Sequence, residues 1–262
     1  MDQTHFHTHQ LSDVYDAVAT KFSQTRSKFQ HSFELDQICR LINAYRPASQ
    51  APHIRILELG CGDGRLYAYL KKHCIHDFTY TGVDISQSMI KLADQSYPET
   101  NRIIDDMNIY LQNLQPLELD IVVSVATYQH LPTDTHRTQH LQSIYQALSY
   151  GGLCLMTNRS RSYRMCRKYW KRYLKSCVLF VMTLWYHNDR NDMYIPFGLE
   201  GKVYERYYHI FLLSELKTLY RRAWFVIQTA CHIDKWGNLT QSRTYAKNTL
   251  ISGIKDVILE WS

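Results

Sequence analysis

A glycine-rich turn and a nearby acid are the residues of this chain whose types and spacing best suit ligand chemistry. Residues 54–65, IRILELGCGDGR, run from an apolar segment into an acid and then three glycines within five residues. Glycine tolerates positive φ and lets a ligand approach the backbone closely. A second segment, 80–84, ends in Asp84, 20 residues beyond Gly64. Because an acid at that distance accepts hydrogen bonds from ribose hydroxyls in βαβ nucleotide sites, these residues predict a nucleoside-binding site.

The elements that must position this turn predict an open α/β sheet. Residues 54–59 suit a buried parallel strand, and 120–125, DIVVSV, form a continuous apolar run expected at the centre of the sheet. Ser86 is expected to cap a helix over 87–96. Strands and helices alternate, which implies right-handed crossovers and a doubly wound sheet. The other expected elements are strands at 102–104, 153–156, 224–231 and 245–251, helices at 11–22, 33–45 and 65–72, a helix before Gly151, and a helix capped by Ser214.

Length and composition favour a single decorated α/β domain. The chain has 262 residues, of which 45% are hydrophobic, enough to build one substantial core. We expect four parts along the chain. They are a tail with substrate-side helices (1–52), a nucleoside-binding core (53–158), a basic helical insertion (159–200) and the C-terminal part of the core (201–262).

Positive charge gathers in one stretch rather than over the whole chain. The formal net charge is +6, yet residues 159–175 alone carry +8 with no acid, which leaves the rest of the chain at −2. Local basicity of this kind suits contact with a polyanion. Apolar residues recur in the same stretch at helical spacing, so an RNA-facing helix, a membrane-surface helix and a solvated lid all remain open. The cations expected to contact RNA phosphates are Arg164, Arg167, Lys168 and Lys171.

Several classes of protein are disfavoured by the sequence. Seven cysteines, an odd number without a C-x-x-C pair, indicate reduced thiols and hence a cytoplasmic protein. The N-terminus lacks the cationic start and apolar core of a secretory signal. The longest apolar run, 177–186, is too short to span a membrane. We interpret the alternating histidines at the N-terminus as a frayed polar tail rather than a metal site. They are His5, His7 and His9.

The glycine turn reads E-x-G-x-G-x-G, and this spacing resembles motif I of class I S-adenosylmethionine-dependent methyltransferases. The resemblance implies S-adenosylmethionine as cofactor and a mostly parallel seven-stranded sheet closed by an antiparallel pair. Asp84 would then bind the ribose. Asp106, after the third strand, would accept the adenine amino group, although a loop carboxylate that only starts a turn is the alternative. The expected cofactor-binding residues are Glu58, Gly60, Cys61, Gly62, Gly64, Asp84, Ile85, Met89, Asp106, Met107 and Val125.

Three further segments resemble the eukaryotic tRNA methyltransferases that esterify 5-carboxymethyluridine at the anticodon wobble position. They are VYDAVATKFSQTR (14–26), SVATYQHLPTDTHR (124–137) and YERYYHIFLLSELKTL (204–219). The RYYH-x-F-x-x-x-EL pattern in the last is the most distinctive. This resemblance implies tRNA as the acceptor and, as in the eukaryotic members, a small zinc-binding activator protein as a partner.

The expected chemistry relies on positioning more than on a base. A carboxylate acceptor with a pKa of about 4 is already ionised at neutral pH, so its methylation requires no strong general base. Arg26 and Arg206 are the expected holders of a carboxymethyl or phosphate group, because guanidinium matches planar oxyanions. His130 and His209 are expected to line the same pocket. Weaker candidates for contacts with the acceptor are Thr25, Tyr207 and Tyr208.

Two other functions remain open from the residues alone. One is a small-molecule carboxyl or O-methyltransferase with a basic lid, and the other is a non-catalytic subunit that binds the cofactor and scaffolds a partner. The unbroken glycine turn together with Asp84 disfavours the scaffold, since a chain that binds no donor has no physical need for those glycines.

Overall fold

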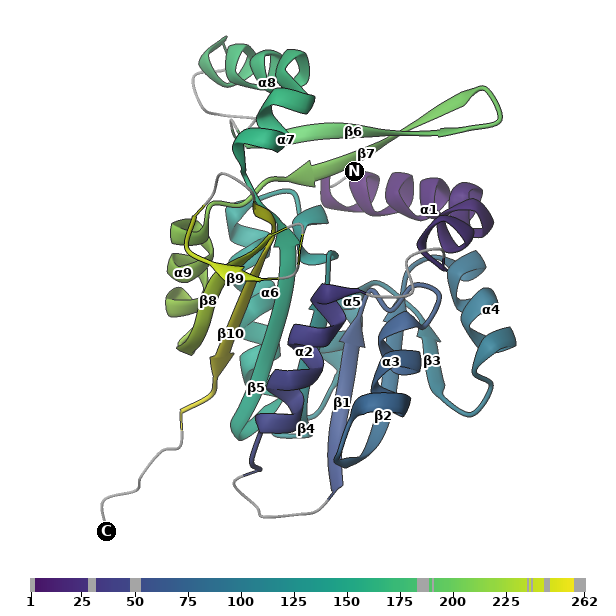
Figure 1. Ribbon diagram of the computed structural model, residues 1–262, viewed down its shortest axis with the longest axis vertical. Coiled ribbons are helices and arrows are strands. Elements are labelled where there is room, and N and C mark those ends of the chain that lie inside the picture. The colour runs from purple at the N-terminus through teal and green to yellow at the C-terminus, as the bar shows by residue number, and fades with distance from the viewer. Residues whose placement is uncertain are drawn as a thin grey trace.

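An eight-stranded, mostly parallel sheet forms the centre of the molecule (Figure 1). The computed structural model describes residues 3–27, 32–47, 53–182, 189, 191–234, 236, 238–242 and 246–256. In spatial order the strands are β3 (Asn101–Ile104), β2 (Asp77–Asp84), β1 (His53–Leu59), β4 (Leu119–Val125), β5 (Leu148–Arg159), β10 (Ala246–Ile254), β8 (Val226–Asp234) and β9 (Leu239–Thr240). The first five run parallel, and β10 is antiparallel to both β5 and β8. The predicted doubly wound sheet is confirmed.

The predicted count of seven strands is wrong, because the two-residue strand β9 pairs with the end of β8 and adds an eighth. The expected antiparallel pair at 224–231 and 245–251 is present as β8 and β10. Within this pair, β10 lies between β5 and β8 rather than at the edge of the sheet.

Helices cover both faces of the sheet and bury two apolar layers. Strand β1 shows the alternation, since Leu57 and Leu59 face one layer while Ile54 and Ile56 face the other. The first layer includes residues of α5 (Met107–Asn113), α6 (Asp134–Ala147) and α9 (Leu213–Arg222). The second includes residues of α2 (Phe33–Ala44) and α3 (Arg65–His73). All these helices except α5 were expected, α3 because it follows the glycine turn and the others from their hydrophobic spacing.

Two helix starts test the expected caps. The Ser86 side chain accepts a hydrogen bond from the Met89 amide at 3.2 Å and caps α4 (Gln87–Ser96), as predicted. The prediction that Ser214 caps the later helix is wrong, since α9 begins one residue before it and Leu212 occupies the cap position. There the carboxylate of Glu215 accepts from the Leu212 amide at 3.4 Å, which satisfies one of the free donors of the first turn.

The insertion after β5 contains a hairpin as well as helices. Helices α7 (Tyr163–Lys168) and α8 (Trp170–Met182) are followed by β6 (Asp192–Leu199) and β7 (Lys202–His209), which form a separate antiparallel ribbon. Figure 1 shows this ribbon between α8 and the long first helix, α1 (Gln3–Ser27). In the described part of the chain no helix has the length and apolar character needed to cross a membrane.

Two glycines of the turn after β1 test how closely that turn packs against Thr127. Gly60 and Gly62 both have positive φ, +75° and +54°, but only at Gly60 would an added Cβ meet another side chain, 2.1 Å from Oγ1 of Thr127. Both Gly→Ala changes should cost about 1–2 kcal/mol of left-handed strain, and Gly60→Ala should lose about 1–3 kcal/mol more through overpacking. Urea unfolding measures the difference, and equal losses for the two variants would contradict the packing described here.

Candidate active site

A cleft of about 910 Å³, including the solvent at its mouth, opens where the parallel strands end. Ligands bind at this edge in open α/β sheets. Helix α1 covers one side of the cleft, and the 3₁₀ turn η1 (Tyr128–His130), which follows β4, forms another part. The lining residues are Leu11, Tyr15, Phe22, Gly60, Val83, Asp84, Ile85, Met89, Asp105, Asp106, Met107, Asn108, Val125, Ala126, Thr127, His130, Leu131 and Pro132.

Asp84 is fixed at the floor of this cleft by the glycine turn. Its Oδ2 accepts from the Gly62 amide at 2.8 Å, and its Oδ1 accepts from the Ser86 amide at 2.9 Å. Burial raises the pKa of the Asp84 carboxyl, although these two hydrogen bonds act to lower it. Each oxygen keeps a second lone pair for a ligand hydroxyl. The arrangement therefore suits a ribose with two vicinal hydroxyls.

Asp106 also lines the cleft, with a structural duty of its own. It caps α5, and its Oδ1 accepts from the Asn108 amide at 2.7 Å and from the Ile109 amide at 3.4 Å. The other oxygen, Oδ2, is left available for a donor such as an amino group. The structure thus shows the alternative role, a carboxylate that starts a helix, and the predicted adenine contact is compatible with it because Asp106 borders the cleft.

Four of the predicted cofactor residues do not border the main cleft. Glu58 and Cys61 lie in a smaller neighbouring cavity that shares Gly60 with it. Burial raises the pKa of Glu58 to about 8, with the Tyr80 hydroxyl as hydrogen-bond donor acting in the opposite direction. Gly62 and Gly64 shape the turn, since Gly62 donates to Asp84 and Gly64 begins α3 in a left-handed conformation. Gly62 and Gly64 therefore shape the cleft by setting the course of the backbone rather than by bordering it.

Helix α1 is attached to the cleft by polar contacts. Asp16 accepts from the Ser86 hydroxyl at 2.7 Å and from the Ser88 amide at 2.8 Å, at the start of α4. An acid is favourable there because the helix N-terminus carries a partial positive charge. Ser12 donates to the Ile85 carbonyl at 3.2 Å. These contacts hold α1 over the residues that follow Asp84.

His130 joins the cleft to the hairpin. Its Nδ1 lies 2.7 Å from the carbonyl oxygen of Tyr207, and its Nε2 lies 3.1 Å from the Tyr15 hydroxyl. A carbonyl only accepts, so Nδ1 carries the proton. In the neutral ring Nε2 is then the acceptor, which the Tyr15 hydroxyl satisfies. The prediction that His130 lines the pocket agrees with this position.

Arg206 lies just behind the wall of the cleft, on β7, and only 8% of it is exposed. Its guanidinium is surrounded by aromatic rings, two of which, Tyr15 and Phe22, line the cleft. The other two are Phe197 and Tyr208, at 5.1 and 5.4 Å from ring centroid to guanidinium carbon. Burial acts to lower the pKa of Arg206, but Tyr208 and Tyr15 outweigh it and the pKa is raised. The residue is a buried cation.

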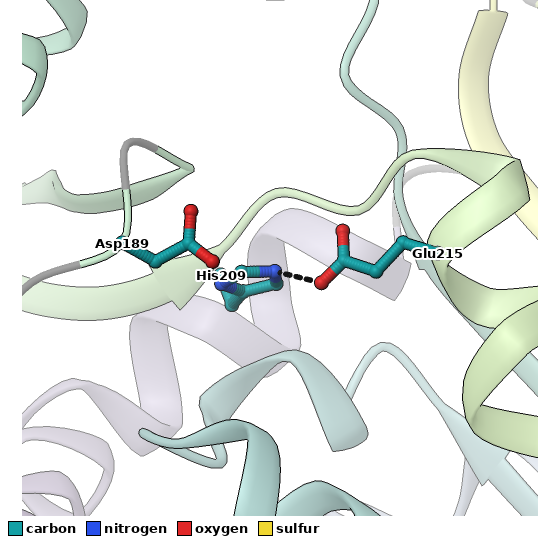
Figure 2. A group of neighbouring side chains, drawn as sticks. All are labelled: Asp189, His209 and Glu215. Carbon is teal, nitrogen blue, oxygen red and sulfur yellow. Dashed lines mark hydrogen bonds and ion pairs between the residues drawn. The ribbon is translucent and has the colours of Figure 1, made fainter. Parts of the chain in front are cut away.

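His209, three residues further along the same strand, belongs to a different environment. Its ring nitrogens lie 2.7 Å from an oxygen of Asp192 and 2.6 Å from an oxygen of Glu215, and the side chain is fully buried. Figure 2 shows the contact between His209 and Glu215. Tyr207 hydrogen-bonds the same Asp192 at 2.7 Å. The fully buried Arg137 lies nearby, 3.6 Å from Asp192. The predictions that His209 and Tyr207 contribute to the pocket therefore differ from the structure, in which neither borders the cleft.

This group resembles a metal site only in its residue types. Ligand atoms of Asp189, His209 and Glu215 lie within 4.8 Å of one another (Figure 2). However, both nitrogens of His209 face carboxylates, which accept hydrogen bonds, so both carry protons and neither has a lone pair for a metal. Burial lowers the pKa of His209, but the bonds to Asp192 and Glu215 outweigh that effect and raise it. His209 and Glu215 instead belong to a buried ion-pair network with Asp192 and Arg137.

The remaining predicted residues lie apart from the cleft or outside the described side chains. Thr25 is exposed, and its hydroxyl donates to the Lys21 carbonyl at 2.7 Å. Tyr208 packs edge-on against His130, 4.7 Å between ring centroids. The side chains of Arg26 and Arg164 lie outside the described residues, as do those of the N-terminal histidines. Arg167, Lys168 and Lys171 are exposed on α7 and α8, and none of them lines the cleft.

Sequence reasoning did not assign Tyr15 or Phe22 to the site. Both recur on the apolar face of the helix at 11–22, a spacing that predicts only packing against the fold. Their presence on the same helix as Ser12 and Asp16, which precedes the sheet, gave a usable signal. Aromatic residues next to short polar ones on one helix face suit a ligand-covering surface as well as a core.

Residues 57–154 match the family described as a methyltransferase domain. The malonyl-[acyl-carrier protein] O-methyltransferase of Bacillus cereus is 32% identical over 113 residues, or 42% of this chain and 39% of that protein. The tRNA (carboxymethyluridine(34)-5-O)-methyltransferase of Arabidopsis thaliana is 28% identical over 145 residues, or 55% of this chain and 31% of that protein. The chain thus spans well under half the length of either relative.

Solved structures share the fold over nearly the whole chain. The Burkholderia thailandensis 1,6-didemethyltoxoflavin-N1-methyltransferase, with bound 1,6-didemethyltoxoflavin and S-adenosylhomocysteine, superposes with a TM-score of 0.60. The alignment covers 97% of this chain and 91% of that one at 13% identity. At this level of identity the likeness establishes the fold and leaves the acceptor open.

The position of Asp84 predicts its effect on the donor. Asp84→Ala removes two charge-assisted contacts to ribose hydroxyls, so we expect S-adenosylmethionine to bind about 30- to 150-fold more weakly, equivalent to about 2–3 kcal/mol. Isothermal titration calorimetry measures this directly. Asp77→Ala, at the opposite and exposed end of β2, is the matched control and should leave the affinity unchanged. An unaltered affinity in a folded Asp84→Ala protein would remove Asp84 from the cofactor site.

The raised pKa of His209 predicts how stability varies with pH. Its protonated form is favoured in the folded state, so its contribution is complete below the unfolded value of about 6.5 and declines as pH rises through the folded value. We expect the difference in unfolding free energy between the parent and His209→Gln to shrink with increasing pH. Urea titrations across that range measure it, with the exposed His53→Gln as control. A difference that grows with pH would contradict the ion-pair assignment.

The cleft, the glycine turn and Asp84 fit the nucleoside half of the cofactor, because a carboxylate with free lone pairs faces a cavity bordered by a glycine. S-adenosylmethionine is accordingly the cofactor of this fold. Residues 57–154 match the methyltransferase-domain family, the chain has the fold of S-adenosylmethionine-dependent methyltransferases, and it resembles the tRNA carboxymethyluridine methyltransferases.

Proposed function

We propose that this protein transfers a methyl group from S-adenosylmethionine to a carboxylate, and that the acceptor is 5-carboxymethyluridine at the wobble position of tRNA. The observation that carries the proposal is the buried guanidinium of Arg206 beside the donor cleft. A catalytic site that must hold an anionic acceptor requires such a group, whereas a site for a neutral acceptor does not.

Arg206 has no acidic counterpart in the part of the chain that the structure describes. None of the ion pairs found there includes it, although Arg137, which is also buried, has two carboxylates within 4.0 Å. The Nε atom of Arg206 is buried and makes no hydrogen bond. Burying a charge costs several kcal/mol, and each surrounding aromatic ring returns about 0.5–2 kcal/mol. The carboxylate of a bound acceptor would offset the rest of the cost of burying this charge.

The surroundings of Arg206 connect it to the donor site. The guanidinium carbon of Arg206 lies 6.0 Å from the centre of the Tyr15 ring, and the Tyr15 hydroxyl lies 3.1 Å from Nε2 of His130. Both Tyr15 and His130 line the cleft. A carboxylate between the cleft and Arg206 would therefore lie against the aromatic wall formed by Tyr15 and Phe22.

In this reaction the residues of the protein orient the acceptor and exclude water. When bound, S-adenosylmethionine provides an electrophilic methyl group. The acceptor carboxylate is ionised at neutral pH, so one oxygen can attack without a base while the other is held by Arg206. Helix α1, attached through Asp16, keeps water from the reacting atoms. Tyr15, whose hydroxyl donates to His130, forms part of the aromatic wall beside Arg206.

Similarity to the two curated relatives supports the class of acceptor. The names of both enzymes specify O-methylation, one of a malonyl group on a carrier protein and one connected with carboxymethyluridine. Malonyl and carboxymethyl groups each bear a carboxylate. The preference for tRNA rests on the three segments at 14–26, 124–137 and 204–219. The last of these contains Arg206 of β7, and the first contains Tyr15 and Phe22.

A carboxylate on a small molecule or carrier protein is the second candidate acceptor, favoured by the 32% identity to the Bacillus cereus enzyme. Both candidates use the same donor and the same cation. They differ in the body that carries the carboxylate, so parallel assays with bulk tRNA and with malonyl thioesters distinguish them. Methyl transfer to the thioester alone would replace the tRNA proposal and retain the carboxylate.

Arg206 gives the decisive variants. Arg206→Ala should lower kcat/KM for methyl transfer by about 30- to 150-fold, since a charge-assisted pair of about 2–3 kcal/mol is lost, while donor affinity stays close to that of the parent. Arg206→Lys keeps the charge without the planar fork and should lie between the two. Arg222→Ala, which breaks an exposed pair with Asp134, is the control. Full activity of a folded Arg206→Ala protein would sink the proposal, and joint loss of donor binding would make Arg206 structural.

A further inference from the structure

Helix α8 exposes several large apolar residues and buries a polar one. Trp170, Leu174, Val178 and Val181 are 57%, 54%, 48% and 67% exposed. By contrast Ser176 is buried, and its hydroxyl donates to the Asp189 carbonyl at 3.2 Å. This polarity is the reverse of that expected for a surface helix of a globular protein.

Helical geometry shows that the exposed apolar residues form one stripe. At about 100° per residue, positions 170, 174, 178 and 181 fall within an arc of about 80°. Arg172 and Ser176 project to the opposite side, where Arg172 pairs with Glu205 of β7 at 2.8 Å. The apolar stripe thus faces directly away from the body of the protein.

Cations border this stripe. Lys171 and Lys175 are exposed and project along one edge of it, about 20° to 60° from Val178 on the helical wheel. Arg167 and Lys168 are exposed on the preceding helix, α7. The sequence from 159 to 188 contains no acid. The surface therefore combines uncovered apolar area with positive charge, and an apolar patch of this kind marks an interaction site.

We propose that α8 docks the protein peripherally on an anionic lipid surface. The stripe would enter the boundary between headgroups and acyl chains, with Trp170 at the level where indole rings partition, and Lys171 and Lys175 would extend to lipid phosphates. A helix of 13 residues is about 20 Å long, so it lies along the surface. This inference does not rest on the proposed acceptor.

The distribution of residue types favours a lipid surface over RNA. RNA supplies phosphates for the lysines and bases that stack on aromatic rings, but it offers nothing to Leu174, Val178 and Val181. A bilayer interface accommodates the lysines with its phosphates and the apolar residues with its acyl chains.

The position of α8 also leaves the cleft accessible. Arg172 of α8 pairs with Glu205, whereas the next residue of the strand, Arg206, packs against Tyr15 of α1. Successive residues of a strand point to opposite faces, so α8 and α1 lie on opposite sides of the hairpin, as Figure 1 shows. Docking through α8 would therefore not obstruct the region around α1.

Vesicle sedimentation of the full chain tests this. The probe is phosphatidylcholine vesicles with and without phosphatidylglycerol. We expect binding only when the anionic lipid is present, and weaker binding at high salt. Lys171→Gln with Lys175→Gln should lower the partition coefficient about 30-fold, at about 1 kcal/mol per cation. Leu174→Ser with Val178→Ser should lower it at least tenfold.

Matched controls and readouts distinguish the other occupants. Lys72→Gln with Lys91→Gln and the exposed Ile75→Ser should leave vesicle binding unchanged. Donor affinity serves as the check of folding for every variant. Failure of the parent to bind anionic vesicles overturns the proposal. So does tRNA affinity that falls with the lysine pair while vesicle binding does not, which would assign the surface to RNA. Self-association that is lost in Leu174→Ser with Val178→Ser, without vesicle binding, would assign it to a second copy.

Discussion

The buried ion-pair network of Arg137, Asp192, His209 and Glu215 is the interaction on which the arrangement of the site depends. It joins α6, the two strands of the hairpin and α9, which are far apart in the sequence. Two carboxylates balance a guanidinium and an imidazolium, so the group carries no net charge into the interior. Removing any one member would leave the others uncompensated, which is strongly destabilising. The end of β7 is therefore fixed in position and register.

With β7 fixed, strand alternation sets the two functions of the RYYH segment. Tyr207 and His209 face the network, while Arg206 packs on Tyr15 of α1 and Tyr208 packs on His130, both of which line the cleft. The same four residues thus provide the support on one side and the proposed acceptor contacts on the other. Helix α1 completes the site, because its rings enclose the guanidinium and Asp16 attaches it to the loop that follows Asp84. Donor and acceptor positions are thereby coupled through one helix.

The donor half of the site could be predicted because its signals are local. The glycine turn, Asp84 and the Ser86 cap each depend on a few neighbouring residues, and all lie where the sequence indicated. The acceptor half depends on tertiary contacts. His209 was placed in the pocket beside Arg206, yet a strand separates odd from even positions, and the buried acids that hold His209 come from distant elements. The β6–β7 hairpin was missed because the cations and aromatic residues before it suggested only helices.

Identification of the methylated atom tests the central claim most directly. The purified protein would be incubated with S-adenosylmethionine carrying a labelled methyl group and bulk tRNA, and the modified nucleoside would be characterised by mass spectrometry before and after mild alkali. A methyl ester on a carboxylate hydrolyses under such conditions and releases the label as methanol. The account predicts a labelled carboxymethyluridine ester that is lost in this way. Label that survives alkali on a base nitrogen, a ring carbon or a ribose hydroxyl would contradict it.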